Sequence, residues 1–271
     1  MNKNMNILII GDGFVGKNLN NYFKNTYNVS ITNRKILDVN DPVSVEKFFK
    51  KANFTHIIYC AGLKDVAKCE TNESLAYDTN SNSLVNISKY LTNEKFIYLS
   101  TDYVFDGHKG LYKENDTTNP NTIYGKSKLL GETNSLTYFS NPIVVRTSGV
   151  YGKGCKWIEW LLTTSDKEIS CFIDVYNSPT YVYDLAEMII NVIKQDFRGI
   201  VNLAGSDVVN RYELYSEVFK YKKNTITNLT KGTSNNTFPK NISLDVSLYR
   251  GIVNKTPMSI EQGLKALFNE N

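Results

Sequence analysis

Cysteine and histidine are scarce in this chain. Its 271 residues include four cysteines and two histidines, and no two cysteines are spaced as Cys-x-x-Cys. Structural zinc sites use closely spaced Cys and His ligands, so no metal site is expected. Sparse, unpaired cysteines in a chain of this length are typical of a reducing compartment, and we therefore expect a cytoplasmic protein.

Long apolar runs are also absent. The N-terminal run Ile7–Ile10 is too short for the core of a signal peptide, which needs about 7–15 apolar residues. No run approaches the roughly 20 apolar residues of a transmembrane helix. We therefore expect neither secretion nor a membrane partner.

Charge of one sign is not concentrated anywhere. The chain has 31 Lys and Arg against 27 Asp and Glu, a net charge of +4, and the two signs are interleaved. Proteins that bind nucleic acid usually gather positive charge on one face, so no nucleic-acid partner is expected. A basic pocket that receives phosphates explains the same mild excess.

The first half of the chain alternates short apolar runs with amphipathic stretches. The runs predict strands at Ile7–Ile10, Asn28–Thr32, Thr55–Cys60, Phe96–Ser100 and Pro142–Ser148. The stretches between them predict helices at Val15–Phe23, Val43–Lys51, Ser74–Leu91 and Ile123–Leu136. Apolar strands separated by helices indicate a parallel sheet covered on both faces. The predicted fold class is α/β, with a Rossmann-type, doubly wound parallel sheet.

The second half is more broken, and we expect a smaller lobe there. Its predicted helices and strands are Trp157–Leu162, Glu168–Ile173, Val182–Lys194, Gly199–Leu203, Arg211–Phe219 and Ser259–Phe268. We expect residues 1–150 to form the dinucleotide-binding domain, with segments returning to it from the second half. Residues 151–271 would form mainly a substrate lobe. The segment Thr225–Pro239 has no apolar period and predicts a mobile loop.

A glycine-rich run follows the first predicted strand. Gly11, Gly13 and Gly16 form a G-x-G-x-x-G motif between a strand and a helix, the context in which this motif binds a dinucleotide. Gly11 permits the tight turn, Gly13 lets the backbone approach a pyrophosphate, and Gly16 lets the helix pack on the strand. The amides at the start of the helix, from Phe14 and Val15, then face the phosphates. A glycine turn without a ligand is the alternative.

The residues at the end of the second predicted strand indicate whether the cofactor ribose carries a 2′-hydroxyl or a 2′-phosphate. An acidic residue about 20 residues past the glycines would bind the 2′-hydroxyl of NAD, but the chain has Asn33-Arg34-Lys35. Two cations can pair with a 2′-phosphate, which favours NADPH, with NADH still possible. The alternative is that Arg34 and Lys35 lie on a solvated loop and bind no phosphate. Asp38, followed by Val39, can meet the adenine or cap the next helix.

A Tyr-x-x-x-Lys pair supplies candidate catalytic groups. Tyr124 and Lys128 lie four residues apart, on one face of a helix. A free tyrosine has a pKa of about 10, and a nearby ammonium, helped by the positive nicotinamide ring of the oxidised cofactor, would lower it by favouring the phenolate. Tyr124 can then protonate an oxygen that becomes an alkoxide. Thr101, at the end of the fourth strand, can donate to the same oxygen.

Longer motifs around these residues resemble a known family. The run Leu99–Gly107, the run Tyr124–Glu132 and the run Arg146–Gly152 are similar to dTDP-4-dehydrorhamnose reductases, as are Asn177–Val182 and Asn202–Gly205. The resemblance covers nearly the whole chain, and the Ser-Thr-Asp-Tyr-Val-Phe-Asp-Gly run is highly specific. It implies an extended short-chain reductase that uses NAD(P)H to reduce the C4 keto group of a nucleotide-linked 4-keto-6-deoxy sugar.

The resemblance also implies roles for individual residues. Tyr124 would be the proton donor, Lys128 its partner and a cofactor contact, and Thr101, Asp102 and Tyr103 would contact or tune the sugar. Further cofactor contacts would come from strand ends and the loops that follow them, at Ala61, Gly62, Leu63, Asn80 and Leu99. The protein would act as a monomer or homodimer on a nucleotide-sugar substrate.

The chain departs from the family pattern at several positions. The glycine motif is one residue shorter than usual, Gly149 stands where Trp is common beside the sugar, and Asn18 replaces a Glu that helps bind Mg²⁺ in some members. A dehydratase would add a carboxylate pair beside the catalytic Thr, whereas Thr101 is followed by Asp102-Tyr103. A related epimerase stays open, as does a regulatory subunit that resembles the methionine adenosyltransferase beta subunit.

Overall fold

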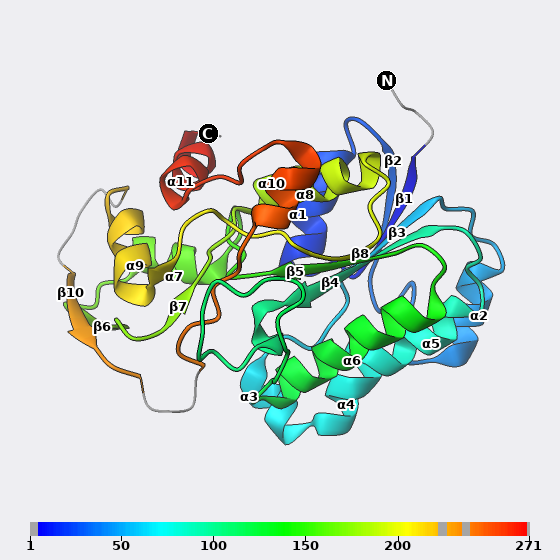
Figure 1. Ribbon diagram of the computed structural model, residues 1–271, viewed down its shortest axis with the longest axis horizontal. Coiled ribbons are helices and arrows are strands. Elements are labelled where there is room, and N and C mark those ends of the chain that lie inside the picture. Colours follow the sequence, from blue (N-terminus) through cyan, green and yellow to red (C-terminus); the bar gives the residue numbers. More distant parts are fainter. Residues whose placement is uncertain (1–4, 222–226, 235–238, 270–271) are drawn as a thin grey trace.

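A six-stranded parallel sheet forms the centre of the molecule. The computed structural model describes residues 5–221, 227–234 and 239–269. The strands are β1 (Asn6–Ile10), β2 (Asn28–Thr32), β3 (His56–Tyr59), β4 (Lys95–Thr101), β5 (Pro142–Thr147) and β8 (Gly199–Asn202). Their spatial order is β2-β1-β3-β4-β5-β8, and every neighbouring pair is parallel (Figure 1). The α/β class with a Rossmann-type sheet is thus confirmed.

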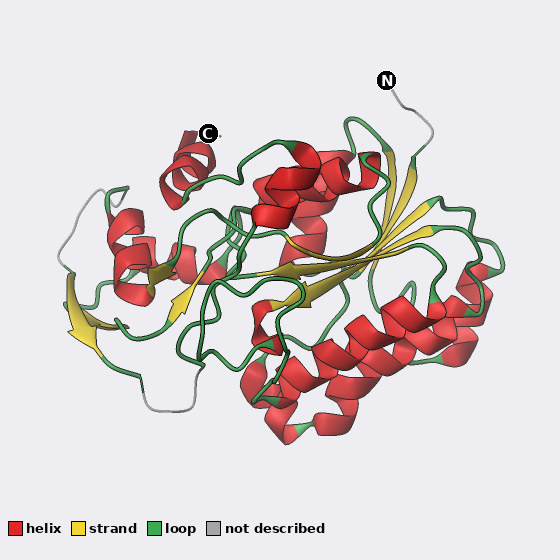
Figure 2. Cartoon of the chain, viewed as in Figure 1, coloured by secondary structure: helices red, strands yellow, loops and turns green. Residues whose placement is uncertain are grey.

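Helices cover both faces of this sheet. On one face lie α1 (Phe14–Phe23), α8 (Val182–Lys194) and α10 (Ser247–Val253). On the other lie α2 (Pro42–Phe49), α3 (Val66–Thr71), α4 (Glu73–Tyr77), α5 (Ser83–Ser88) and α6 (Ile123–Tyr138), as Figure 2 shows. Because successive strand residues point to opposite faces, Ile7 and Ile9 join one core and Leu8 and Ile10 the other. This is why the strands are apolar throughout.

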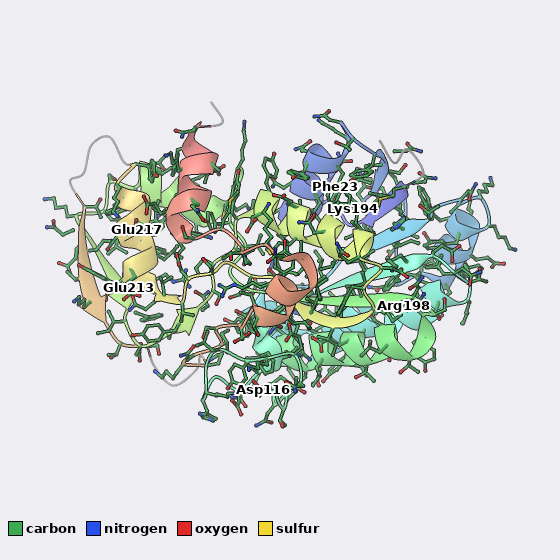
Figure 3. All side chains as sticks on the ribbon, turned by 45° about the horizontal axis from the view of Figure 1, so that its top comes forward. Phe23, Asp116, Lys194, Arg198, Glu213 and Glu217 are labelled. Atoms are coloured by element: carbon green, nitrogen blue, oxygen red, sulfur yellow. The ribbon has the colours of Figure 1, made fainter. Side chains whose placement is uncertain are left out.

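Two of the helices show how local sequence sets their ends and packing. Asp41 caps α2 by accepting a hydrogen bond from the Val43 amide at 3.0 Å, and Pro42 occupies the first turn, as predicted. Phe23, the last residue of α1, is fully buried in the core that also contains Ile193, beside Lys194 at the end of α8 (Figure 3). The amphipathic pattern of α1 therefore serves its packing against α8.

The long helix predicted at Ser74–Leu91 is interrupted. A π-helical turn, η1 (Asp78–Asn82), separates α4 from α5. Two buried tyrosines of the sheet explain the break, because Tyr59 Oη donates to the Thr79 carbonyl at 2.7 Å and Tyr98 Oη to the Asn80 carbonyl at 2.6 Å. Buried phenols need acceptors, and the widened turn presents its carbonyls to them.

A smaller lobe is built from the second half of the chain. It contains α7 (Lys156–Thr163), α9 (Arg211–Phe219) and α11 (Ile260–Asn269), with β6 (Glu168–Phe172), β7 (Tyr176–Asn177), β9 (Val209–Asn210) and β10 (Asn228–Gly232). These elements enclose their own apolar core. The helix α9 presents Glu213 and Glu217 one turn apart (Figure 3). Between these elements the chain returns to the sheet through α8 and β8.

The prediction of a mobile loop at Thr225–Pro239 is wrong for Asn228–Gly232, which is a strand. Asn228–Gly232 forms β10, which pairs in parallel with β6 along its whole length. This strand has no fully buried side chain, so it lacks the alternation that predicts a strand from sequence. Backbone pairing with β6 therefore stabilises β10 as a strand. Residues 225–226 and 235–238 lie outside the described part.

The direction of chain crossover reverses between β1 and β3. The chain passes from β1 to β2 on one side and returns to β3 on the other. In open parallel sheets, ligands bind at the carboxyl ends of the strands at such a switch point. The glycine turn after β1 and the Ala61-Gly62-Leu63 loop after β3 both lie there.

Candidate active site

The glycine turn joins β1 to α1 and leaves a helix end open. Gly11 has φ +108°, and a Cβ there would lie 2.7 Å from the Ala61 amide nitrogen. A Cβ on Gly16 would lie 2.0 Å from the Gly11 carbonyl oxygen, while Gly13 faces open space. Gly13 caps α1 without any side-chain hydrogen bond, and within the described part of the chain the amides of Phe14 and Val15 have no acceptor. The turn can therefore receive a phosphate.

One cavity continues from this turn along the end of β2. It has a volume of about 270 Å³, and its lining includes the predicted cofactor contacts Gly11, Gly13, Asn33, Arg34, Asp38, Val39, Ala61 and Gly62. Arg34 Nε lies 2.9 Å from Asp38 Oδ2, and the Arg34 side chain is 75% exposed. Asp38 does not cap α2, because Asp41 does. Lys35 is exposed and lines a different hollow, at the outer edge of β2, so Arg34 is the cation at this cavity.

A second cavity lies beyond Ala61 and Gly62, at the ends of β4 and β5. Its volume is about 340 Å³. Its lining brings together all the remaining predicted site residues except Gly16, which lines neither cavity: Phe14, Val15, Leu63, Asn80, Leu99, Thr101, Asp102, Tyr103, Tyr124 and Lys128. Cys60, Ala61 and Gly62 line both cavities. Because they share these three residues, the two cavities adjoin and form one cleft.

Asn80 holds the two sides of this cleft together. Its Oδ1 accepts from the Leu63 amide at 2.8 Å, and its Nδ2 donates to the Leu63 carbonyl at 3.1 Å and to Ser127 Oγ at 2.9 Å. Ser127 in turn donates to the Tyr124 carbonyl at 2.8 Å. Asn80 is fully buried, and it therefore fixes the loop after β3 relative to the helix that carries Tyr124 and Lys128.

Tyr124 and Thr101 meet at the end of β4. Thr101 lies close enough to the Tyr124 hydroxyl to lower the pKa of Tyr124 by hydrogen bonding. Thr101 Oγ1 donates to Asp102 Oδ1 at 3.0 Å and accepts from the Tyr103 amide at 3.3 Å. The Tyr103 ring lies edge-on to that of Tyr124, with centroids 5.6 Å apart. Two hydroxyls thus stand side by side where a carbonyl oxygen can approach.

Lys128 lies one turn further along α6 and is buried. Its Nζ donates to the Leu99 carbonyl at 2.5 Å and sits 4.0 Å from the centre of the Tyr98 ring. Burial lowers the pKa of Lys128 to about 7, although the Glu132 carboxylate raises it. Near neutral pH the side chain therefore exists in both its charged and its neutral form.

The pKa of Tyr124 moves opposite to the prediction from sequence. Burial raises it well above its usual value, the hydrogen bond with Thr101 lowers it, and the Asp102 carboxylate raises it further. Lys128 does not offset this rise, because the same loss of water that disfavours the phenolate also disfavours the ammonium. The Tyr124 phenol is therefore protonated at neutral pH, which is the form that can donate a proton.

A buried ion pair lies behind these groups. Arg146 on β5 and Glu132 on α6 form two hydrogen bonds, of 3.0 and 2.7 Å, and both side chains are almost fully buried. Ser100 Oγ donates to the same carboxylate at 2.5 Å. Because Ser100 precedes Thr101 and Glu132 follows Lys128 by one turn, the pair ties β4, β5 and α6 together under the site.

Several polar groups of the cleft were missed from sequence. Thr147, at the end of β5, lines the second cavity, and its hydroxyl is buried without a hydrogen-bond partner in the described part of the chain. Ser148 donates to Asp102, and Arg211 at the start of α9 lies close enough to Tyr103 to lower its pKa, which burial and Asp102 raise to about 12. Only the position of Thr147 at a strand end gave a signal beforehand.

The comparisons with known proteins agree with this arrangement. The model of the RmlD substrate binding domain matches residues 5–270. The chain belongs to this family. The resemblance to dTDP-4-dehydrorhamnose reductases is thereby confirmed.

Individual relatives include both reductases and a subunit of another enzyme. The dTDP-4-dehydrorhamnose reductase of Mycobacterium tuberculosis (strain ATCC 25618 / H37Rv) is 33% identical over 195 residues, which cover 68% of this chain and 64% of that protein. The methionine adenosyltransferase 2 subunit beta of Danio rerio is 32% identical over 170 residues, 58% of this chain and 53% of that protein. Both alignments span less than two thirds of the relative.

A solved structure matches over the whole chain. The dTDP-4-dehydrorhamnose reductase of Bacillus anthracis str. Ames, in complex with NADP, has a TM-score of 0.92 and 28% identity, and covers 98% of this chain and 100% of that one. Within the described residues, no group of three or more His, Cys, Asp or Glu side chains can hold a metal ion, and no helix is long and apolar enough to cross a membrane.

Proposed function

We propose that this RmlD-family chain reduces the C4 keto group of a nucleotide-linked 4-keto-6-deoxy sugar with NADPH. The observation that carries the proposal is the meeting of Tyr124, Thr101 and Lys128 at the far end of a cleft that begins at the glycine turn. The names of the reductase relatives support the same chemistry. We further propose that it acts in the cytoplasm.

The residues of the cleft fit a nicotinamide dinucleotide in an extended form. The free amides of Phe14 and Val15 would bind the pyrophosphate, while Asn33, Arg34, Asp38 and Val39 would surround the adenosine half. Arg34 uses one N–H for Asp38, so its other donors stay available for a 2′-phosphate, which favours NADPH over NADH. The remaining predicted contacts, Ala61, Gly62, Leu63, Asn80 and Leu99, would line the path to Tyr124. When bound, the cofactor supplies a hydride.

Tyr124 would donate the proton that converts the reduced oxygen into a hydroxyl. Its raised pKa keeps the phenol protonated until negative charge develops beside it. Thr101 would donate a second hydrogen bond to the same oxygen and stabilise that charge. Lys128, bonded to Leu99 and close below Tyr124, would then favour the phenolate electrostatically while the phenol is without its proton.

The lobe of residues 151–271 would bind the sugar nucleotide opposite Tyr103. Arg211 on this lobe carries no carboxylate partner among the described residues and acts electrostatically on Tyr103. Lys64 lines the second cavity. One cation in the lining and a second near Tyr103 suit a diphosphate, and the unpaired Thr147 hydroxyl suits a sugar hydroxyl or an amide.

The assay for this function is the loss of NADPH absorbance on mixing with dTDP-4-keto-6-deoxy sugar after its 3,5-epimerisation. Removing the proton donor with Tyr124→Phe should lower kcat by about 10²- to 10⁴-fold. Tyr249→Phe is the matched control, because it removes a buried hydroxyl that bonds Asn191 away from the cleft. UDP- and GDP-linked sugars would rank the nucleotides.

A regulatory subunit is the second candidate, favoured by the similarity to the methionine adenosyltransferase subunit. That function predicts NADPH binding without oxidation of the cofactor by any keto-sugar nucleotide. Absence of turnover with all three nucleotides, together with tight NADPH binding, would therefore replace the reductase proposal. Slow interconversion of sugar epimers without net NADPH loss would instead indicate an epimerase.

A further inference from the structure

Asp102 is a buried carboxylate that stands directly behind the Thr101 hydroxyl. It is 3% exposed. Oδ1 accepts from Thr101 Oγ1 at 3.0 Å, and Oδ2 accepts from Ser148 Oγ at 2.5 Å. Within residues 5–221, 227–234 and 239–269 it forms no ion pair with Lys, Arg or His. Both carboxylate oxygens thus already accept hydrogen bonds from protein hydroxyls.

The hydroxyl of Thr101 has a single proton, and in the structure this proton is donated in the hydrogen bond to Asp102. With its proton directed at Asp102, the Thr101 hydroxyl has no second proton for an oxygen in the cleft. Thr101 can donate to a substrate only if Asp102 stops accepting from it. Protonation of Asp102 achieves this, because Oδ1–H becomes a donor to Thr101 Oγ1.

Ser148 determines which oxygen of Asp102 receives the added proton. Ser148 Oγ accepts from the Ser178 amide at 3.1 Å, so its own proton points to Asp102 Oδ2. Oδ2 therefore stays an acceptor, and a proton added to the carboxylate goes to Oδ1, which faces Thr101. The Thr101 proton must then turn into the cleft.

We propose that Asp102 is a positioning residue whose protonation state directs the Thr101 hydroxyl either at the carboxylate or at the reacting oxygen. This inference rests on the proposed reductase function. It gives Asp102 the role of tuning the site through Thr101, without contacting the sugar.

The surroundings of Asp102 raise its pKa to a value near neutral pH, where a change of protonation state can affect the reaction. Burial raises the pKa of Asp102 to about 6, while the hydrogen bonds from Ser148 and Thr101 lower it. The titratable groups that face it are Tyr103 from its own turn and Tyr124 from α6, and it raises the pKa of both. The nearby cations are engaged elsewhere: Lys128 bonds Leu99, and Arg211 acts on Tyr103 and stacks on Tyr215.

The pH profile of kcat/KM reports this group in the free enzyme. Above the pKa of Asp102, the fraction with Thr101 pointing at the cleft falls tenfold per pH unit, and kcat/KM should fall with it. The fall should level off once Tyr124 alone supports the reaction. The full drop should be about 10²- to 10³-fold, the usual effect of losing one donor to an oxyanion.

Asp102→Asn should remove this pH dependence. Because Ser148 supplies a proton, the amide oxygen should face Ser148 and the NH₂ group should donate to Thr101, as a protonated carboxyl does. The fall that begins near pH 6 should disappear, and only the fall set by Lys128, whose pKa is about 7, should remain. Asp184→Asn is the matched control, since Asp184 is also 3% exposed and accepts from the Met258 amide away from the cleft. It should leave the wild-type profile unchanged.

Ser148→Ala provides a second variant that keeps Asp102. Removing the hydrogen bond that lowers the pKa of Asp102 should shift the fall in kcat/KM to higher pH. It should also lower the low-pH value, because the added proton can then go to Oδ2 and leave Thr101 donating to Oδ1. An Asp102→Asn profile that still falls like the wild type, or a Ser148→Ala profile that shifts to lower pH, would overturn the proposal. If Asp102→Asn does not fold, the direction of the Ser148→Ala shift decides.

Infrared titration of the protein without cofactor gives a readout apart from turnover. A carboxyl band that titrates near pH 6, disappears in Asp102→Asn and moves to higher pH in Ser148→Ala would support the switch. No such band in the wild type would overturn it. Absence of turnover with every keto-sugar nucleotide would defeat the reductase proposal alone, because the infrared result does not depend on a substrate.

Discussion

Replacing Asn80 with Asp changes one atom type inside the clamp that joins the cofactor loop to the catalytic helix. In the wild type, Asn80 Nδ2 donates to the Leu63 carbonyl and to Ser127 Oγ, at 3.1 and 2.9 Å. Ser127 cannot donate in return, because its proton goes to the Tyr124 carbonyl. An oxygen in place of Nδ2 therefore faces two acceptors in a fully buried position.

The size of the effect follows from these contacts. Two hydrogen bonds of about 1 kcal/mol each are lost, and an ionised carboxyl without a cation is buried, so we expect a loss of ~3–5 kcal/mol in the free energy of unfolding. Protonation of the introduced carboxyl gives it one O–H group that can donate a hydrogen bond. The pKa of the introduced carboxyl is therefore raised in the folded state, and the loss should shrink as pH falls below that pKa.

Urea unfolding at pH 5 and pH 8 measures this loss, and NADPH fluorescence titration measures cofactor affinity alongside it. Asn82→Asp is the matched control, because Asn82 is exposed in the same turn and bonds only Asp78, at 3.0 Å. We expect Asn80→Asp to lose stability and NADPH affinity, more at pH 8 than at pH 5. Equal effects of the two substitutions, or a loss that does not depend on pH, would refute the reasoning.

Two further predictions concern the cofactor cleft. Gly16→Ala puts a methyl group 2.0 Å from the Gly11 carbonyl oxygen; the helix must shift, and NADPH affinity should fall by about 10- to 100-fold, an overpacking effect of ~1–3 kcal/mol. An affinity within twofold of the wild type, by fluorescence titration, would contradict this. Arg34→Ala removes a charged donor from the adenosine cavity, which should weaken NADPH about 10- to 100-fold and leave NADH unchanged. Equal weakening of both cofactors would show that Arg34 does not bind the 2′-phosphate.

Local sequence patterns predicted the sheet well. The strand Asn28–Thr32 and the helix Val182–Lys194 have the predicted bounds, and Asp41-Pro42 starts its helix as expected. These elements carry their own signals, either an apolar run, an amphipathic period or a cap. The motif order, from Gly11 through Thr101 to Tyr124 and Lys128, likewise placed the candidate site at the strand ends where the cleft lies.

The predictions that failed depended on contacts between distant segments. The helix Ser74–Leu91 is broken by hydroxyls from Tyr59 and Tyr98. The strand Asn228–Gly232 exists because β6 offers it a backbone partner. The pKa of Tyr124 is raised by burial, which spacing along a helix does not reveal. No sequence pattern could have shown that Ser148 directs the protonation of Asp102, since their elements meet only in the fold.

Transfer of deuterium from NADPH labelled at C4 of the nicotinamide traces the reaction without relying on absorbance. The labelled cofactor, the purified protein and the epimerised dTDP-4-keto-6-deoxy sugar would be incubated, and the sugar product analysed by NMR and mass spectrometry. A 4-ketoreductase gives a product with one deuterium, bound to C4 of the sugar, and Tyr124→Phe gives almost none. Deuterium at another carbon, or an unlabelled sugar after full conversion, would contradict hydride transfer to C4.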